Sequence, residues 1–506
     1  MRTKNSVLNF LTSIIPFITF VILGFLKVHV WQDSLDPNVY ALNQLFFQVF
    51  AYLSIAEAGI GALVQKEYYK LLIDEDQDTI CKYYTLSKRM LRNVCYVIMI
   101  CGFVTSFFLK YLAKGNDLSQ RYMQQVFLLF LIKSLVEYFM FAPRFVLTAD
   151  QKMYKINFQL YFYKILETVL ETALIYVGFS YVFVLCCSIV LRIIMNLRLN
   201  SIVAKEYTWL HTVNDVGNLK IKGMQHVFIF KIASALQENI GALLISSFVN
   251  PISVIIYTNY KYITKYINDF VYQLGTAITS SMGNLLYGDD KDSGYDTYEM
   301  VNTMFYFIAS FLTIAIGYCI NSFIIIWVGK DKVLESISLL CLLFVFFHNI
   351  ARRPLFILKD VFALYKELQF ISITESIVTV VVSFVFVKKG IQGILFANVI
   401  AILLTTFFYL PIAIYKYVFN RFPFVDFAKY FFSVIISGAF LWGSIKWIPV
   451  IPSDGILTWF LGSCIYSMLV LILLSSVFFL FLKSFRELCF RVVSFIMSLK
   501  KDNSKY

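Results

Sequence analysis

The sequence is poor in charge, in histidine and in recognisable catalytic motifs. Charged residues make up 15% of its 506 positions, against roughly 25% in soluble globular proteins. None of the four histidines has a Cys or acidic residue at metal-ligand spacing, and the nine cysteines form no CxxC pair, so we expect neither a metal site nor a disulfide framework. A GxxxxGKS/T phosphate loop is absent, which excludes an ATP-driven pump within this chain. We therefore predict that the protein is not an enzyme and has no catalytic residues and no cofactor.

Apolar residues are correspondingly abundant in the sequence. They make up 59% of the chain, and the mean hydropathy is +0.73. A helix needs about 20 mainly apolar residues to cross a bilayer, and such stretches recur along the whole sequence. We therefore predict an all-α integral membrane protein with about fourteen transmembrane helices. The predicted spans are residues 8–30, 39–65, 92–113, 122–142, 157–178, 181–203, 224–249, 252–280, 300–327, 334–351, 367–387, 391–418, 427–447 and 455–482.

The basic residues follow the predicted loops and do not gather on one surface. The formal net charge is +13, but no compact basic patch with interleaved aromatic residues is present, so we expect no nucleic-acid partner. With the N-terminus placed in the cytoplasm, and basic residues towards the ends of a span counted with the adjoining loop, 29 of the 44 Lys and Arg residues fall on the cytoplasmic side, 8 on the outer side and seven deeper within spans. This distribution obeys the positive-inside rule and predicts a multi-pass protein with both termini in the cytoplasm. Topology thus accounts for nearly all of the net charge, which is no evidence for an anionic substrate.

Loop lengths repeat once along the chain. A long charged inner loop, residues 66–91, follows the second predicted helix, and an acidic loop, residues 289–299, takes the same place six helices later. Many transporters are built from such repeats. We predict a six-helix lobe at residues 1–205, a second at 206–420, two additional transmembrane helices at 421–482 and a basic cytoplasmic tail at 483–506.

Ten charged side chains lie within four of the predicted spans, where each costs ~2.5–3.5 kcal/mol at the centre of the helix. Residues three, four or seven apart share one face of a helix. The charges of each span therefore form a stripe, which should face the bundle interior or a wet cavity. The ten are Lys133 and Glu137; Lys164, Glu167 and Glu171; Lys231 and Glu238; and Lys261, Lys265 and Asp269.

These stripes have two interpretations, and the sequence leaves both open. In the first, opposite charges pair to lock the bundle, and Lys133 with Glu137 already makes a good intrahelical ion pair. In the second, an unbalanced stripe binds an ion. Two cations face one carboxylate in the stripe that begins at Lys261, so its surplus suits an anion, whereas the surplus in the stripe that begins at Lys164 is negative and suits a coupled cation or proton.

Single charges in other predicted spans are further candidates. Arg192 has no partner on the same face of its own span, so it either pairs across helices or binds an anionic group. Glu57 and Glu375, in the inner parts of their spans, are lesser candidates for ion coupling. Lys27 lies near an outer end, where we expect its side chain to reach the interface.

Several short segments resemble, in the same order along the chain, those of Wzx-type polysaccharide repeat-unit flippases. These proteins belong to the multidrug/oligosaccharidyl-lipid/polysaccharide (MOP) transporter superfamily. The resemblance extends from the first to about the twelfth span, although related sequences often have Asp where this chain has Glu238. The segments are AEAGIGAL at 56–63, YYKLL at 68–72, ADQKMY at 149–154, KI at 231–232, ENI at 238–240, ISSF at 245–248, YTNY at 257–260 and SMGNL at 281–285.

The resemblance implies two six-helix lobes around a central cavity that opens alternately to the two sides of a bacterial cytoplasmic (inner) membrane. The implied substrate is an undecaprenyl-diphosphate-linked oligosaccharide for surface polysaccharide such as capsule or O-antigen. Expected partners are this substrate, membrane lipids, a polysaccharide polymerase and glycosyltransferases. Candidates for the diphosphate are Lys261, Lys265, Lys231 and Arg192; candidates for ion coupling are Glu167, Glu171, Glu238, Asp269 and Glu57.

Two other functions remain as alternatives. A cation-coupled multidrug or metabolite antiporter of the same superfamily would need a net acidic, apolar-lined cavity. A membrane glycosyltransferase or polymerase would need a substantial outer loop with catalytic acids, and the predicted map has none.

Overall fold

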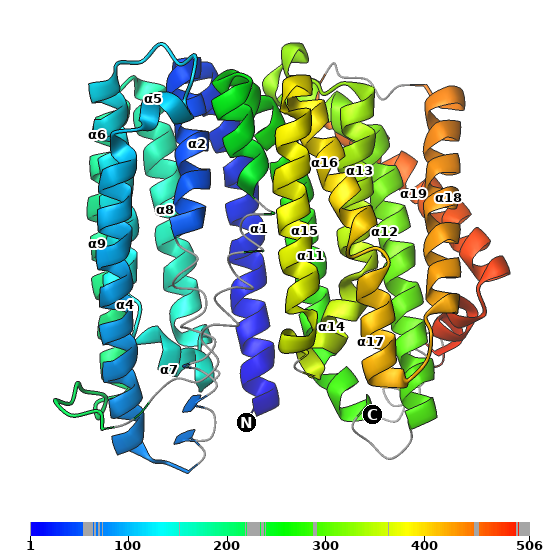
Figure 1. The fold of residues 1–506 in the computed structure, drawn as a ribbon, viewed down its shortest axis with the longest axis horizontal. Helices are drawn as coiled ribbons and strands as arrows, with labels where there is room; N and C mark the ends of the chain where they lie inside the picture. Colours follow the sequence, from blue (N-terminus) through cyan, green and yellow to red (C-terminus); the bar gives the residue numbers. More distant parts are fainter. Residues whose placement is uncertain are drawn as a thin grey trace, which may run out of the picture. The chain divides into compact units, whose positions relative to one another are not determined.

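The computed structural model is helical throughout the part of the chain that it describes, with no β-strand there (Figure 1). This confirms the predicted all-α fold class. Figure 1 shows the long helices of each unit running roughly parallel to one another, as helices of a membrane bundle do. The described residues are 2–53, 64, 67, 68, 71, 72, 74–150, 152–217, 219, 233, 237, 239–286, 291–362, 364–449, 455–491 and 494.

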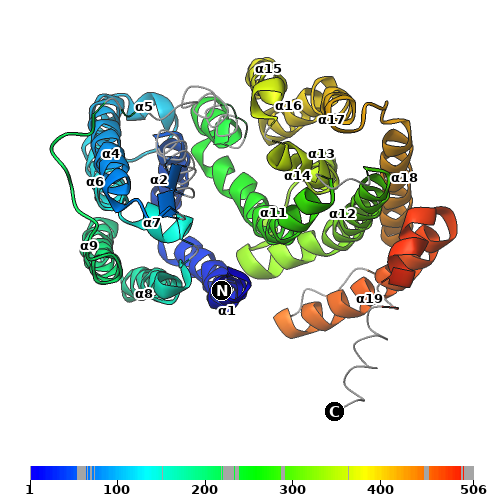
Figure 2. The ribbon, with the colours of Figure 1, turned by 90° about the horizontal axis from the view of Figure 1, so that it is seen from below.

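Contacts between residues divide the chain into two compact units, Met1–Ile255 and Ile256–Tyr506. In the first unit α1 packs along α8, α6 packs on α4 and α9, and α8 packs on α9 (Figure 2). Its helices are α1 (Arg2–Ser34), α2 (Pro37–Leu53), α4 (Gln77–Ser106), α5 (Leu109–Leu112), α6 (Gln120–Met140), α7 (Arg144–Ala149), α8 (Tyr154–Val177) and α9 (Tyr181–Glu206).

In the second unit α12 is the central helix, because it packs against α13, α18 and α19. The long helix α11 (Pro251–Leu286) begins in the first unit and continues into the second. The others are α12 (Lys291–Val328), α13 (Ser336–Ala351), α14 (Arg353–Val361), α15 (Tyr365–Phe386), α16 (Gly390–Leu404), α17 (Tyr409–Phe419), α18 (Phe424–Trp447) and α19 (Ile456–Phe481).

Each of the fourteen predicted spans is helical over most of its described part. Seven helical stretches of the described residues are long and apolar enough to cross a membrane, and all seven overlap predicted spans. They are Gln120–Met140, Tyr181–Glu206, Gly294–Val328, Ser336–Val361, Lys366–Phe419, Phe424–Trp447 and Ile456–Phe481.

The span predicted at 391–418 is broken into α16 and α17. The backbone leaves the helical conformation at Thr405, with φ −127° and ψ −90°, and its hydroxyl donates back to the carbonyl of Ala401 at 2.6 Å. Such back-bonding by Thr competes with the regular helix. The carbonyl of Phe407 has no helical donor, because residue 411 is a proline without an N–H, and it accepts a hydrogen bond from Arg352 at 3.3 Å.

Two short helices between spans were not predicted. Helix α7 has only six residues and α14 nine, too few for a clear apolar period. Helix α13 ends at Ala351, and Pro354 lies in the first turn of α14. Proline is favoured there because its missing N–H has no partner in a first turn.

Candidate functional site

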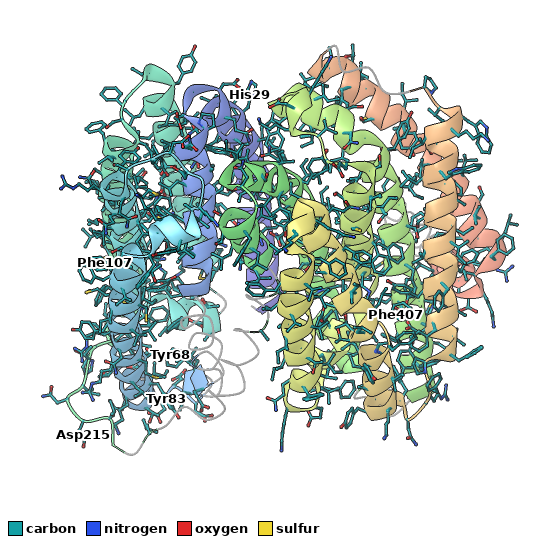
Figure 3. The ribbon with its side chains drawn as sticks, turned by 45° about the horizontal axis from the view of Figure 1, so that its top comes forward. His29, Tyr68, Tyr83, Phe107, Asp215 and Phe407 are labelled. Carbon is teal, nitrogen blue, oxygen red and sulfur yellow. The ribbon has the colours of Figure 1, made fainter. Side chains whose placement is uncertain are left out.

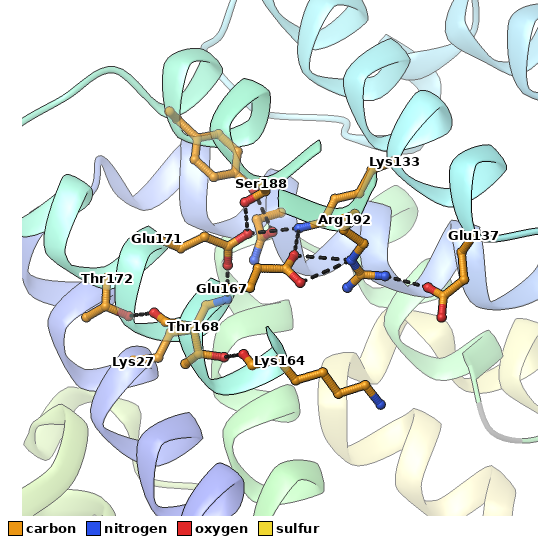
Figure 4. Close-up of polar contacts among 12 residues, drawn as sticks. Lys27, Lys133, Glu137, Lys164, Glu167, Thr168, Glu171, Thr172, Ser188 and Arg192 are labelled. Atoms are coloured by element: carbon orange, nitrogen blue, oxygen red, sulfur yellow. Dashed lines mark hydrogen bonds and ion pairs between the residues drawn. The ribbon is translucent and has the colours of Figure 1, made fainter. Parts of the chain in front are cut away.

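A cluster of charged side chains lies inside the first unit (Figure 4). Glu167 and Glu171 project from the same side of α8 and are buried, with 8% and 4% of their side chains exposed. Helices α1 and α9 pack against α8, and α6 packs against α9. A buried carboxylate is stable only when it is paired, so both groups depend on cations from these neighbouring helices.

Four helices are joined at Glu171. Its Oε2 accepts a hydrogen bond from Nζ of Lys27 on α1 at 2.5 Å, and its Oε1 accepts one from Nζ of Lys133 on α6 at 2.8 Å. The hydroxyl of Ser188 on α9 also donates to Oε1. Two cations and a hydroxyl thus satisfy this carboxylate, and its charge is fully compensated within the first unit.

The network continues through Glu167. Its Oε1 lies 2.6 Å from Nζ of Lys133, and its Oε2 lies 3.1 Å from Nε of Arg192 on α9. The guanidinium of Arg192 extends further, with Nη1 2.6 Å from Oε2 of Glu137 on α6. Cations and carboxylates therefore alternate from Lys27 to Glu137, with three of each.

Lys164 is the fourth cation of this region. It lies one turn before Glu167 on α8, and among the described residues no carboxylate comes within ion-pair distance of its Nζ, which lies 5.7 Å from the ring centroid of Tyr161. Figure 4 shows its side chain extending away from the paired carboxylates. Four cations against three carboxylates leave one positive charge, and Lys164 carries it.

The structure gives several of these residues partners other than those considered from the sequence. Lys133 and Glu137, considered as an intrahelical pair, each form their ion pairs with other helices. Arg192 pairs across helices, which is one of its two predicted alternatives. Lys27, expected to reach the interface, binds Glu171. The negative surplus expected within α8 disappears, because neighbouring helices supply the cations.

The charged stripe of Lys261, Lys265 and Asp269 lies on α11, in the second unit, and is more exposed to solvent than the charged cluster of the first unit. Lys265 Nζ lies 3.9 Å from Asp269 Oδ2, and their side chains are 54% and 45% exposed. Lys261 is half-buried, with its Nζ 5.8 Å from the ring centroid of Tyr257. The structure thus keeps Lys261, Lys265 and Asp269 along one helix. Three other predicted site residues, Lys231, Glu238 and Glu57, lie outside the described residues.

The second unit contains a fully buried ion pair that sequence reasoning missed. Arg352, between α13 and α14, and Asp426, on α18, have no exposed side-chain surface, and their Nη1 and Oδ2 atoms are 2.6 Å apart. The hydroxyl of Tyr306 donates to Asp426 Oδ1 at 2.6 Å, and Asn302 Nδ2 donates to it at 2.8 Å. The guanidinium carbon lies 4.4 Å from the ring centroid of Tyr430. This pair connects α12, α18 and the start of α14.

A second missed pair supports the same contact. Lys429 on α18 forms an ion pair with Glu299 on α12 and donates to the hydroxyl of Thr303 at 3.1 Å. The hydroxyl of Tyr415 donates to Glu299 at 3.0 Å. All four residues are buried. Because both pairs are enclosed by the protein and their opposite charges lie side by side, we assign them to the stability of the second unit.

Solved structures of membrane transporters resemble this fold. The lipid II flippase MurJ, in an inward closed conformation, superposes with a TM-score of 0.68 at 14% identity, over 92% of this chain and 98% of that chain. An outward-facing MATE family multidrug resistance transporter of the MOP superfamily gives 0.56 at 15% identity, over 87% and 96%. A MOP superfamily transporter from Pyrococcus furiosus, described as having a binding pocket of reverse polarity, gives 0.53 at 13% identity, over 84% and 94%.

Sequence comparison adds no closer relative. No family model matches the chain, and no curated protein matches it. At identities of 13–15% the structural similarity concerns the fold alone. The chain therefore has the fold of MOP superfamily transporters.

Proposed function

We propose that this protein is a flippase for lipid-linked oligosaccharides that are joined to their lipid through a diphosphate. In this proposal it moves them by alternating access from the cytoplasmic to the outer leaflet of a bacterial cytoplasmic membrane, where they are assembled into surface polysaccharide. Glycosyltransferases would supply the substrate and a polymerase would use it. The observation that carries the proposal is the surplus cation Lys164 beside carboxylates that are already paired.

An anionic substrate fits this cluster better than a cationic one. An antiporter of cationic drugs needs a carboxylate that can receive the drug's charge. Glu171 faces Lys27 and Lys133, and Glu167 faces Lys133 and Arg192, so a cation would have to displace two protein cations from either carboxylate. A diphosphate can instead approach Lys164 without breaking an ion pair of the described residues.

The stripe on α11 supports the same sign of charge. Two lysines accompany one carboxylate there, and Lys265 is more than half exposed. A lysine ammonium offers three donors to phosphate oxygens. We propose Lys261 and Lys265 as phosphate-binding residues within the second unit. The similar folds of a lipid II flippase and of multidrug transporters support transport of an amphiphile or a drug, and the charge of the cluster favours the anionic amphiphile.

The experiment is flipping by the purified, full-length chain in proteoliposomes. The vesicles contain a fluorescent polyprenyl-diphosphate-linked sugar in both leaflets, and dithionite quenches only the outer leaflet. A charge-assisted hydrogen bond to the diphosphate predicts that Lys164→Gln slows flipping roughly 10- to 100-fold.

Two controls separate the charge of Lys164 from other effects. Lys164→Arg keeps the charge and should retain most of the rate, and Lys110→Gln removes an exposed cation of α5 and should change nothing. If Lys164→Gln flips the lipid at the wild-type rate while it is as stable as the wild type, the assignment of Lys164 is wrong.

A further inference from the structure

A second basic site lies outside the charged cluster, where α4 meets the segment that follows α9. A cavity of about 310 Å³ there is lined by Lys88, Arg89 and Arg92 of α4, by Phe139 of α6 and by residues 212–214. Pockets that bind small ligands begin at roughly 300 Å³. The cavity is therefore large enough for a phosphate group and the atoms next to it.

Hydrogen bonds between α4 and residues 213–214 hold the two walls of this cavity together. The hydroxyl of Thr85 accepts from the backbone N–H of Val213 at 2.9 Å, and Nη2 of Arg89 donates to the carbonyl of Asn214 at 2.9 Å. Thr85, Lys88, Arg89 and Arg92 follow one another at spacings of three, one and three residues, so they share one face of α4. The loop is thus fixed beside three cations.

No carboxylate neutralises these cations within ion-pair distance among the described residues. The nearest acid in the sequence of the loop, Asp215, lies at its outer edge in Figure 3, and its Oδ1 accepts from the N–H of Gly217 at 2.8 Å. The following sequence, 216–237, contains no Asp or Glu. Three cations around one cavity repel each other, and an anion with several acceptor oxygens relieves that repulsion.

The surroundings favour an anion that belongs to a lipid. Beyond Arg92 the exposed side chains of α4 become apolar, as at Tyr96, Val97 and Ile100. Phe139, which lines the cavity, is exposed as well. The cavity therefore lies where the polar end of α4 meets a surface suited to lipid tails, and basic pockets at this depth bind anionic head groups.

We propose that Lys88, Arg89 and Arg92 bind the phosphate of an anionic membrane phospholipid, which attaches this end of α4 to its leaflet. The site is separate from the transported substrate, and the proposal does not depend on what the protein transports. A free phosphate shares the same chemistry, so the test includes both sources.

Native mass spectrometry of the full-length chain in detergent measures the binding. The probes are phosphatidylglycerol, zwitterionic phosphatidylcholine and inorganic phosphate. Each basic side chain near an anionic lipid contributes about fivefold to affinity, so Lys88→Gln/Arg89→Gln/Arg92→Gln should weaken phosphatidylglycerol binding roughly 100-fold and leave phosphatidylcholine binding unchanged. Lys88→Gln/Arg92→Gln, which keeps the bond from Arg89 to the loop, should weaken it roughly 30-fold.

The matched control removes three exposed cations near the other end of α4, in Lys110→Gln/Lys114→Gln/Arg121→Gln, and should bind phosphatidylglycerol as the wild type does. The proposed site would be overturned if both triple variants lost the same affinity for phosphatidylglycerol. It would also be overturned if the wild type bound phosphatidylglycerol no more tightly than phosphatidylcholine. Binding of inorganic phosphate that depends on Lys88, Arg89 and Arg92, without any such dependence for the lipid, would overturn the lipid assignment.

Discussion

Asp426→Ala should destabilise the second unit by about 3–5 kcal/mol, the usual cost of removing one partner of a buried ion pair. The Arg352 and Asp426 side chains are both 0% exposed. The lost carboxylate accepts from Arg352 at 2.6 Å, from Tyr306 at 2.6 Å and from Asn302 at 2.8 Å. Its removal leaves a guanidinium without a counter-ion, held by the hydroxyl of Tyr306 and by the carbonyl of Phe407 at 3.3 Å.

Thermal unfolding in detergent measures this cost. The other eight cysteines are replaced by Ser in every chain compared, because several of them are at least partly exposed. Cys319 on α12 is buried, so a thiol-reactive fluorescent dye labels it only when the unit opens. One kcal/mol corresponds to a change in Tm of about 2–4 °C for a unit of this size, so Asp426→Ala should lower Tm by roughly 6–20 °C. The control is Glu487→Ala, which breaks an exposed i,i+4 pair with Lys483 at 3.6 Å and should cost less than about 1 kcal/mol.

A double variant separates the lost ion pair from lost packing. Arg352→Met/Asp426→Leu removes both charges and should cost less than Asp426→Ala alone, because no buried charge is left behind. The reasoning is refuted if Asp426→Ala lowers Tm no more than Glu487→Ala does, or if the double variant is the less stable of the two.

Three further predictions test other parts of the structure. Glu171→Gln should lower the free energy of unfolding by about 3 kcal/mol and should slow flipping. Glu137→Gln, at a carboxylate that is 27% exposed, should lower the free energy of unfolding by less than about 1 kcal/mol. Equal losses of stability in the two variants would contradict the proposed ion-pair network. Gly393→Ala should lower Tm sharply, because its Cβ would lie 2.0 Å from the carbonyl oxygen of Phe386, and Gly438→Ala, with nothing within 4 Å, should raise stability by about 0.5–1 kcal/mol. Lys261→Gln/Lys265→Gln should reduce flipping roughly tenfold or more at unchanged Tm, since one of the two side chains is more than half exposed; a large fall in Tm would indicate a structural role.

The helices could be predicted because each apolar run is about as long as a bilayer is thick. Most of the described helix ends lie within about three residues of the predicted ones. The larger differences occur at helices such as α1, α4 and α12, which continue well beyond their apolar runs. The break at Thr405 was also missed. The sequence holds one sign of it, because Pro411 has no N–H to donate to the carbonyl of Phe407, four residues earlier. The position of the break and the partner of that carbonyl, Arg352, depend on tertiary contacts that the sequence does not show.

The charged cluster was recognised because Glu167, Glu171 and Lys133 stand within long apolar runs. Their partners were not, because spacing along one helix says nothing about which helix lies opposite. Arg352 and Asp426 were missed for a different reason. Both lie in polar segments between predicted spans, where a buried charge and a solvated charge look alike in sequence; only the surrounding tyrosines, seen in the structure, distinguish them.

The central claim, that the protein moves an anionic lipid-linked substrate, is tested most directly by the wild-type chain with three substrates. Proteoliposomes are given a fluorescent polyprenyl-diphosphate-linked sugar, the matching neutral lipid-linked sugar or a cationic dye, with and without proton and sodium gradients. We predict that the diphosphate-linked sugar is flipped faster than the neutral one and that the dye is not transported. Gradient-driven transport of the dye, with no movement of the diphosphate-linked sugar under any gradient, would contradict the claim and establish an antiporter instead.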